Sequence, residues 1–165
     1  MKLTEVLDKR CIQLPLTATD PTAVITQLVD LLFEHGKITD RDAVLQAVLA
    51  RERARSTGLG DGLAIPHGTS SGCAQLAMAA GRLTKPLNFG AMDGQPCEFV
   101  VLLVDAAGQS SPHIQALAGV TRLWLNKKFR EEALLARTPE ELYAMIERHE
   151  PGKERETTSP SVLEQ

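Results

Sequence analysis

The sequence predicts an α/β domain in which helices pack on a β-sheet, and three observations lead to this prediction. Two helical patterns stand before the middle of the chain and two stand after it. Between them, residues 56–104 change to the composition of strands and loops. One run there, EFVVLLV (98–104), is apolar on both faces, which is typical of a central strand covered by helices. Helices that precede, separate and follow strands pack in layers around a sheet.

The first two helices are predicted from their start and stop signals. Asp20 is a candidate cap, Pro21 takes the first helical position, and apolar residues then recur at helical spacing until Gly36. A second helix begins in the TDRD segment (39–42) and runs to about residue 55. Its last turn holds three arginines: Arg51, Arg53 and Arg55. The simplest interpretation is that these cations complement the helix dipole.

The middle of the chain holds the predicted strands. Residues 56–72 are rich in Gly, Ser, Thr and Pro, which indicates strand and loop. QLAMAAGRL (75–83) is a candidate strand, although Ala and Gly weaken the pattern, and MDGQP (92–96) is a turn. The apolar run at 98–104 completes the sheet.

Two more helices follow. One begins in the SSPH segment and continues through IQALAGVTRLWL, with a serine as its cap and Pro112 in its first turn. The other, TPEELYAMI, opens with a capping box: Thr138 caps, Pro139 takes the first position, and Glu141 reaches back to the helix start. We find no internal repeat.

Length and composition indicate one domain. The chain has 165 residues, of which 43% are hydrophobic and 24% charged, as in an ordinary globular protein that is short for two domains. After residue 150 the sequence is polar, contains two prolines and has no periodicity. We therefore expect a domain over residues 1–150 and a disordered tail over residues 151–165.

Several classes of function are disfavoured. A net charge of -3, with one Trp, one Tyr and four Phe, does not suit a nucleic-acid partner. The start, MKLTEVLDKR, lacks the apolar core of a signal peptide, and FVVLLV is too short to cross a membrane. We expect a cytoplasmic protein that is not inserted in a membrane. The three cysteines are Cys11, Cys73 and Cys97; they lie far apart and suggest neither a disulfide framework nor a zinc site.

His67 has unusual neighbours in GLGDGLAIPHG (58–68). Pro66 has a fixed φ and holds Ile65 extended, so we expect the strand to end rigidly at this point. Gly68 removes a side chain next to the ring, and the glycines upstream permit a close-packed backbone. The pattern fits a turn residue with a hydrogen-bonded ring, and it also fits an imidazole presented in an open, shallow site.

His113 falls in the first turn of its predicted helix. The helix dipole and the free N–H groups there disfavour an imidazolium, so we expect a ring that is neutral at pH 7 and donates one hydrogen bond to an anion. An exposed histidine with no function fits the same position. His35, at a helix C-terminus, is interpreted as structural, and His149 as solvated.

The other uses of these histidines lack support. A metal would need a third ligand, and no histidine or carboxylate cluster lies near either position, so we expect no metal. No G-x-S-x-G elbow and no GK[ST] loop is present, and no cofactor is expected. A nucleophilic histidine remains. With a cation from Arg51 or Arg55 and a neutral His113, it suits a phosphoryl group.

RERARSTGLGDGLAIPHG (51–68) closely resembles the active-site signature of the fructose/mannitol-type (type 2) enzyme IIA domains of the bacterial phosphoenolpyruvate-dependent phosphotransferase system. The nearest branch is the free-standing nitrogen-regulatory one. The resemblance continues through PLNFGAMDGQPCEFVVLLV, SSPHIQALAGV and TPEELYAMI, and so spans about residues 5 to 148. It implies a three-layer α/β/α sandwich with a mixed central sheet.

The resemblance also implies roles for individual residues. His67 matches the histidine that an HPr-type phosphocarrier protein phosphorylates. His113 matches the second histidine of the family, which hydrogen-bonds the phosphoryl oxygens, and Arg51 matches the arginine beside the site. Arg53 and Arg55 have no such match. Pro112 is a departure, because the family usually has an ordinary residue before the second histidine.

Two functions are compatible with these residues. In the first, phosphorylation of His67 alters a protein-binding surface, as in the nitrogen-regulatory branch; the lack of a fused transporter or second domain favours it. In the second, the protein is the sugar-specific component of a fructose/mannitol-type transporter and passes the phosphoryl group to EIIB. A binding module that has lost phosphorylation is disfavoured by the intact Arg51, His67 and His113.

Overall fold

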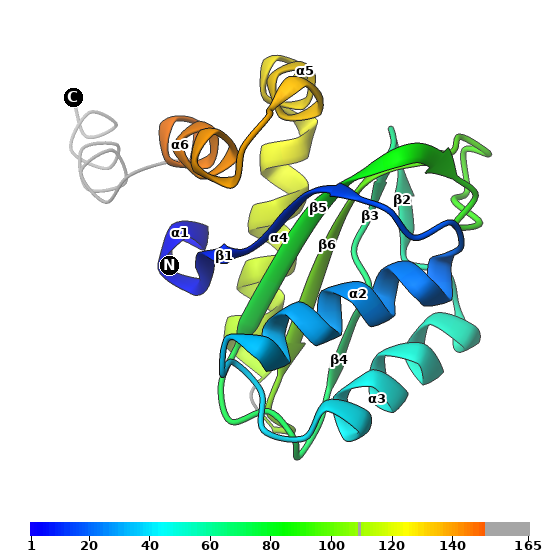
Figure 1. Ribbon diagram of the computed structural model, residues 1–165, viewed down its shortest axis with the longest axis vertical. Helices are drawn as coiled ribbons and strands as arrows, with labels where there is room; N and C mark the ends of the chain where they lie inside the picture. Colours follow the sequence, from blue (N-terminus) through cyan, green and yellow to red (C-terminus); the bar gives the residue numbers. More distant parts are fainter. Residues whose placement is uncertain (109, 151–165) are drawn as a thin grey trace, which may run out of the picture.

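A mixed β-sheet forms the middle layer of the molecule, and helices cover both of its faces (Figure 1). The computed structural model describes residues 1–108 and 110–150. The predicted disordered tail at 151–165 lies outside the described residues. Helices α2 and α3 pack on one face of the sheet, whereas α4, α5 and α6 lie toward the other. The predicted three-layer α/β/α arrangement is thereby confirmed.

The elements follow one another along the chain as α1 (Leu3–Val6), β1 (Leu7–Leu16), α2 (Pro21–Glu34), α3 (Arg41–Ala54), β2 (Gly58–Gly60), β3 (Leu63–Ala64), β4 (His67–Thr69), β5 (Ala77–Leu87), β6 (Cys97–Asp105), α4 (Ser110–Leu125), α5 (Lys127–Leu135) and α6 (Pro139–His149). The strand order is β1-β5-β6-β3-β2, and β4 also pairs with β6. β6 is antiparallel to β5 but parallel to β3 and β4, so the sheet is mixed.

The central strand β6 has an apolar side chain on each face, as its sequence predicts. Within residues 99–104, the even-numbered residues belong to the core shared with α2 and α3: Val100, Leu102 and Val104. The odd-numbered residues of the same run belong to the core shared with α4, α5 and α6: Phe99, Val101 and Leu103. Because successive side chains of a strand point to opposite faces, one apolar run serves two cores.

The helix start signals act as the sequence predicts, with one difference. Asp20 accepts a hydrogen bond from the Ala23 N–H at 2.9 Å, and Thr138 accepts one from the Glu141 N–H at 3.1 Å. The Glu141 carboxylate reaches back one residue farther than the capping box requires and accepts the N–H of Arg137 at 3.2 Å. Each cap satisfies an N–H group that the helix itself leaves free.

Three elements have no counterpart in the sequence-based prediction: α1, β1 and α5. β1 pairs only with β5 and forms one edge of the sheet. An edge strand tolerates a proline such as Pro15, and its pairing with β5 has two register shifts. Its burial therefore shows no regular alternation that a sequence pattern could reveal.

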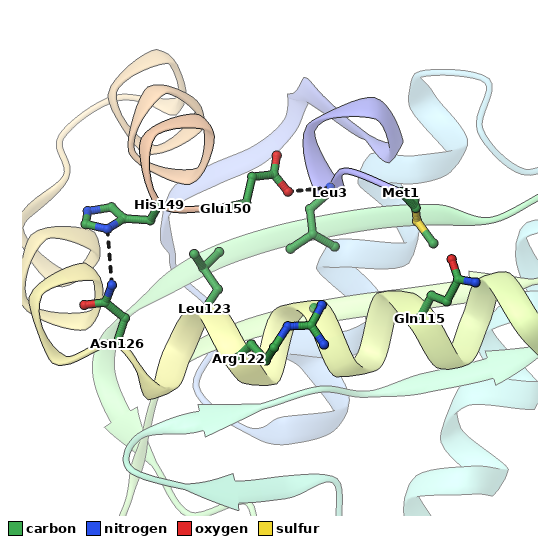
Figure 2. Close-up of a pocket in the computed structure, with 9 residues that line it drawn as sticks. Met1, Leu3, Gln115, Arg122, Leu123, Asn126, His149 and Glu150 are labelled. Carbon is green, nitrogen blue, oxygen red and sulfur yellow. Dashed lines mark hydrogen bonds between the residues drawn. The ribbon is translucent and has the colours of Figure 1, made fainter. Parts of the chain in front are cut away.

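The two ends of the described chain meet beside α4 (Figure 2). The Glu150 carboxylate accepts the N–H groups of Leu3 and Thr4 at 2.7 and 3.2 Å, and so caps α1. Asn126 contacts His149 at 3.4 Å. A small cavity of about 140 Å³ lies between these residues and α4. No helix in the described part of the chain has the length and apolar character needed to cross a membrane.

Candidate functional site

The two singled-out histidines come together in space. His67 begins β4 and His113 lies in the first turns of α4, and their ring centroids are 5.3 Å apart with the planes at 59°. His67 also lines an open groove of about 620 Å³ together with Arg51 and Arg55 from the end of α3. The three residues predicted for the site thus come from three elements, α3, β4 and α4.

The sheet places His67 on the face that α4 covers. β3 and β4 both run parallel to β6, and the Ile65-Pro66 step between them interrupts the strand; the Pro66 carbonyl accepts the Leu103 N–H at 3.0 Å. His67 lies opposite Leu103, whose side chain belongs to the core on the α4 side. The strand expected to end at His67 in fact resumes there, because β6 continues to offer hydrogen-bonding partners.

The structure explains the glycine at position 68 by a contact other than the expected one. A Cβ atom at Gly68 would lie 3.4 Å from the backbone of Ala47 and Val48 in α3. The side that Gly68 leaves empty therefore faces α3, on the opposite face of the sheet from the His67 ring. The glycine lets β4 pack closely on α3.

The turn upstream of the site needs glycine for its backbone. Asp61 and Gly62 have φ values of 52° and 84°, the left-handed conformations that close a tight hairpin between β2 and β3. The Asp93 carboxylate accepts the Asp61 N–H at 2.9 Å, and Trp124 Nε1 donates to the Asp61 carbonyl at 2.8 Å. These two bonds tie the hairpin to the 88–96 loop and to α4.

The hydrogen bond of His67 fixes the tautomer of its neutral ring. Nδ1 lies 2.8 Å from the carbonyl oxygen of Ile65. A carbonyl oxygen only accepts hydrogen bonds, so Nδ1 carries the proton of the neutral ring. Nε2 then keeps its lone pair. The backbone of the same strand segment both orients the ring and selects its tautomer.

The fold adds two causes that favour a neutral His113 to the helix start that the sequence indicates. Its pKa is lowered, in the predicted direction, but burial is the largest cause and the charge of His67 the second, while Asp105 opposes both. α4 begins at Ser110, so Pro112 is its third residue and His113 its fourth. Pro112 lies among the positions whose N–H has no partner within the helix, and it therefore costs α4 no hydrogen bond.

Arg51 is held in place by the end of its own helix. Its Nη1 donates to the carbonyl of Arg55 at 2.8 Å, and both side chains line the groove. A guanidinium has five N–H donors, so this bond leaves most of them for another ligand. Arg53, about 200° around the helix from Arg51, is exposed. The structure brings Arg55 to the groove, a placement that its spacing of four residues from Arg51 could have indicated.

The rim of the groove is apolar, which the sequence analysis did not predict. Leu59 and Met92 line it and are 53% and 93% exposed, and Leu117 of α4 lines it as well. Exposed apolar side chains gathered around a polar site are typical of a surface that contacts another protein. Met92 lies on the turn at 92–96, so only the fold brings it to His67.

Residues able to bind a metal do not gather at the site. Within residues 1–108 and 110–150, no group of three His, Cys, Asp or Glu side chains is arranged to hold a metal ion. The cysteines of this part of the chain are unpaired and buried: Cys11, Cys73 and Cys97. Burial is the largest cause that raises the pKa of each thiol.

Comparison with known proteins decides the family. The family described as "Phosphoenolpyruvate-dependent sugar phosphotransferase system, EIIA 2" matches residues 5–149. The chain belongs to this family. The match covers both histidines, Arg51 and the groove, and it confirms the resemblance that the sequence motifs indicate.

Relatives of this EIIA domain include sugar-specific and nitrogen-regulatory proteins, the two kinds that the sequence analysis considers. It is 33% identical to the fructose-specific EIIABC component of Bacillus subtilis over 91% of the chain, which spans 24% of that longer relative. It resembles the structure of nitrogen regulatory protein IIA-Ntr from Neisseria meningitidis with a TM-score of 0.81 and 28% identity, over 87% of this chain and 98% of that one. A solved complex of Escherichia coli enzyme IIA-mannitol with phosphorylated enzyme IIB-mannitol shares the fold, with a TM-score of 0.73 and 18% identity over 86% of this chain and 98% of that one.

Proposed function

We propose that this EIIA domain accepts a phosphoryl group on Nε2 of His67 from an HPr-type phosphocarrier protein, and that its phosphorylation regulates a partner protein. EIIA domains carry phosphoryl groups within the phosphotransferase system. The observation that supports His67 as the carrier is its tautomer: the Ile65 carbonyl holds the proton on Nδ1, and the ring lines a groove with two arginines.

The proposed phosphoryl transfer needs no general base at the site. The lone pair of His67 Nε2 forms the new N–P bond while the bond between phosphorus and the carrier breaks, and its electron pair returns to the carrier. Nε2 has no proton to lose, and the Nδ1 proton stays on its bond to the Ile65 carbonyl. The phosphorylated ring keeps a positive charge that partly offsets the phosphoryl oxygens.

The groove supplies the charge that phosphoryl transfer needs. Such transfers depend mainly on positioning and on electrostatic stabilisation of the equatorial oxygens. Arg51 presents a planar fork that can hold two oxygens, Arg55 adds a second cation, and His113 adds a directional donor beside the His67 ring. The apolar rim of Leu59 and Met92 gives a partner protein an area to bury around the transferred group.

The phosphoryl group itself can act as the regulatory signal. It adds about -1.5 to -2 charges at neutral pH to a rim that is otherwise apolar. A partner that buries Leu59 and Met92 loses affinity when that charge must be desolvated, whereas a partner with an arginine gains affinity. The likeness to nitrogen regulatory protein IIA-Ntr supports this reading.

A second candidate is transfer onward to an EIIB domain. The fructose-specific relative contains EIIA, EIIB and EIIC parts in one protein, and the mannitol IIA neighbour was solved with its phosphorylated IIB. In this case the groove would accept two partners in turn, the carrier and EIIB.

The test is incubation with phosphoenolpyruvate, enzyme I and the HPr-type carrier, followed by intact-mass analysis. The wild type gains one phosphoryl group that is lost in acid, and His67→Ala gains none. His35→Ala, at the end of α2, is the matched histidine control and behaves as the wild type. Phosphoryl gain by His67→Ala at the wild-type rate would contradict the assignment. Adding an EIIB domain separates the two functions, because only a sugar-specific EIIA passes its phosphoryl group on.

A further inference from the structure

Glu52 is a half-buried glutamate in the last turn of α3 that the proposed transfer does not use. The C-terminus of a helix carries a partial negative charge, so a carboxylate there is unfavourable unless it has hydrogen-bond donors as partners. Its neighbour Arg51 lines the groove, whereas Glu52 is not among the described residues that do so. The place of this carboxylate therefore needs another explanation.

The Glu52 carboxylate holds Thr57 by two hydrogen bonds. Oε2 accepts the N–H of Thr57 at 3.0 Å, and Oε1 accepts the Thr57 hydroxyl at 2.5 Å. A hydroxyl that donates to a carboxylate forms a short and strong bond. Thr57 is only 4% exposed. Without Glu52, both of its donors would lose their partner in a buried position, which is costly.

Thr57 in turn holds the segment that precedes His67. The Thr57 carbonyl accepts the N–H of Ile65 at 3.0 Å. Because Gly58 pairs with Ala64 in the β2–β3 hairpin, this bond continues the same antiparallel ladder by one step toward His67. The Ile65 carbonyl then accepts the proton of His67 Nδ1, which lies 2.8 Å away. A continuous path of hydrogen bonds and backbone therefore joins Glu52 to the ring of His67.

The far side of this segment is fixed by the sheet. The Pro66 carbonyl accepts the Leu103 N–H at 3.0 Å, which ties the segment to β6, and proline has a fixed φ. The Ile65 carbonyl lies between this anchor and the bond to Thr57, so its direction depends on both. β6 supplies the first anchor, and α3 supplies the second through Glu52.

We propose that Glu52 is a positioning residue that, through Thr57, holds the Ile65 carbonyl in line with the proton of the nucleophilic ring. The proton then stays on Nδ1 of His67, and the lone pair of Nε2 is free for the phosphorus. The proposal rests on the proposed function of His67 and deepens it. One turn of α3 serves the site twice, because Arg51 lines the groove while its neighbour orients the nucleophile.

The direction of the effect separates positioning from a simple effect of charge. A negative charge in the field of the site disfavours an anionic group, so a role through charge alone predicts that Glu52→Gln and Glu52→Ala both accelerate phosphoryl uptake. Positioning predicts another order. In Glu52→Gln the side-chain amide can accept the Thr57 N–H and donate to the Thr57 hydroxyl, whereas Glu52→Ala loses both bonds.

The first test uses the unphosphorylated protein, so it does not depend on the transfer reaction. Imidazole ¹⁵N spectra at about pH 8.5, where imidazoles are generally neutral, report which nitrogen carries the proton. In the wild type we expect the proton of His67 on Nδ1, and in Glu52→Ala we expect it to exchange between both nitrogens. His35, at the end of α2, is the internal control. A His67 spectrum that is the same in both proteins would overturn the proposal.

The second test measures phosphoryl uptake over a series of carrier concentrations. Glu52→Ala should lower the maximal rate about ten-fold, which lies between the effect of one hydrogen bond and that of a nucleophile displaced by about 1 Å. The carrier concentration at half-maximal rate should not change, because Glu52 is not among the described residues of the groove wall. Glu52→Gln should keep most of the wild-type rate. Glu34→Ala, which replaces an exposed glutamate in the last turn of α2, is the matched control and should keep all of it.

Variants of Thr57 test the middle of the path by rescue. Thr57→Val keeps nearly the same shape but loses the hydroxyl bond to Glu52, so it should slow the uptake, whereas Thr57→Ser keeps the hydroxyl and should restore the rate. In a double-mutant cycle, Thr57→Val should cost little more when it is combined with Glu52→Ala. Equal losses in Thr57→Val and Thr57→Ser would contradict the proposed path.

The order of the two Glu52 variants decides the role of the carboxylate. Equal rates in Glu52→Gln and Glu52→Ala would contradict positioning, because both variants lack the charge and only one lacks the hydrogen bonds. If Glu52→Ala does not fold, the spectra and rates of the two Thr57 variants decide. If the wild type accepts no phosphoryl group, the proposed function fails, while the spectra still test whether Glu52 sets the tautomer of His67.

Discussion

Replacing Arg51 by alanine tests how the groove stabilises phosphoryl transfer. Arg51 is half-buried, its Nη1 is bonded to the Arg55 carbonyl, and its remaining donors are available to the groove. Removing one preorganised donor from an enclosed site costs about 2.7–4 kcal/mol of transition-state stabilisation. This groove is open to water, which screens the interaction, so we expect about 1–3 kcal/mol, or about 5- to 160-fold in rate.

The assay is the time course of phosphoryl uptake from the carrier, followed by rapid acid-free quenching and intact-mass analysis. Arg51→Lys should recover only part of the rate, because it keeps the charge but loses the planar fork. Arg53→Ala is the matched control, since this exposed arginine lies on another side of the same helix. Circular dichroism and melting temperature check that the loss of the Arg51–Arg55 bond leaves α3 intact.

Wild-type kinetics in both Arg51→Ala and His113→Ala would refute this reasoning, because the groove would then lack the chemistry that its geometry indicates. An equal loss in Arg51→Ala and Arg53→Ala would also refute it. In that case the arginines would act only through the overall field of the protein and not through contact with the phosphoryl group.

Three further predictions concern stability and metal. Leu102→Ala removes a fully buried side chain of β6 and should lower the free energy of unfolding by about 2–5 kcal/mol. Unfolding is measured by the fluorescence of the single tryptophan, Trp124. A loss below about 1 kcal/mol would contradict the buried position of Leu102. Burial raises the pKa of Cys11 to about 11 and that of Cys97 to about 12, from 9.0. Just above pH 9 only the thiols of the unfolded chain ionise, so the free energy of unfolding should be constant below about pH 9 and fall as the pH rises toward 11 to 12. Urea titrations at a series of pH values measure this fall, and Cys97→Ala should weaken it. Treatment of the protein with a chelator, followed by removal of the chelator, should leave phosphoryl uptake unchanged, whereas one tightly held zinc per chain in elemental analysis would contradict this.

Local signals in the sequence determined much of the helical framework. The caps at Asp20 and Thr138 each bond an N–H group three residues away, so the short sequence at each helix start is enough to predict them. The apolar run of β6 also predicted its own central position, because a strand buried on both faces needs apolar residues at every position. The edge strand β1 escaped prediction, since its partner β5 lies about 70 residues away and its own pattern is irregular.

Part of the candidate site could also be predicted from the sequence, whereas another part depends on the fold. His67, His113 and Arg51 could be singled out from residue types, spacing and a family resemblance, and the family is confirmed. The tautomer of His67 depends on the Ile65 carbonyl, which accepts the Nδ1 proton. Burial and the neighbouring His67 ring lower the pKa of His113, and only the fold supplies these two causes.

Tertiary structure alone decided what surrounds the histidines. Met92 reaches the groove from a distant turn, and the register of β4 against β6 places His67 opposite Leu103, on the face that α4 covers. Shifting that register by one residue would turn His67 to the other face. Side-chain type is local information, but the neighbours of a functional side chain are set by pairing between segments far apart in the chain, which no single stretch of sequence contains.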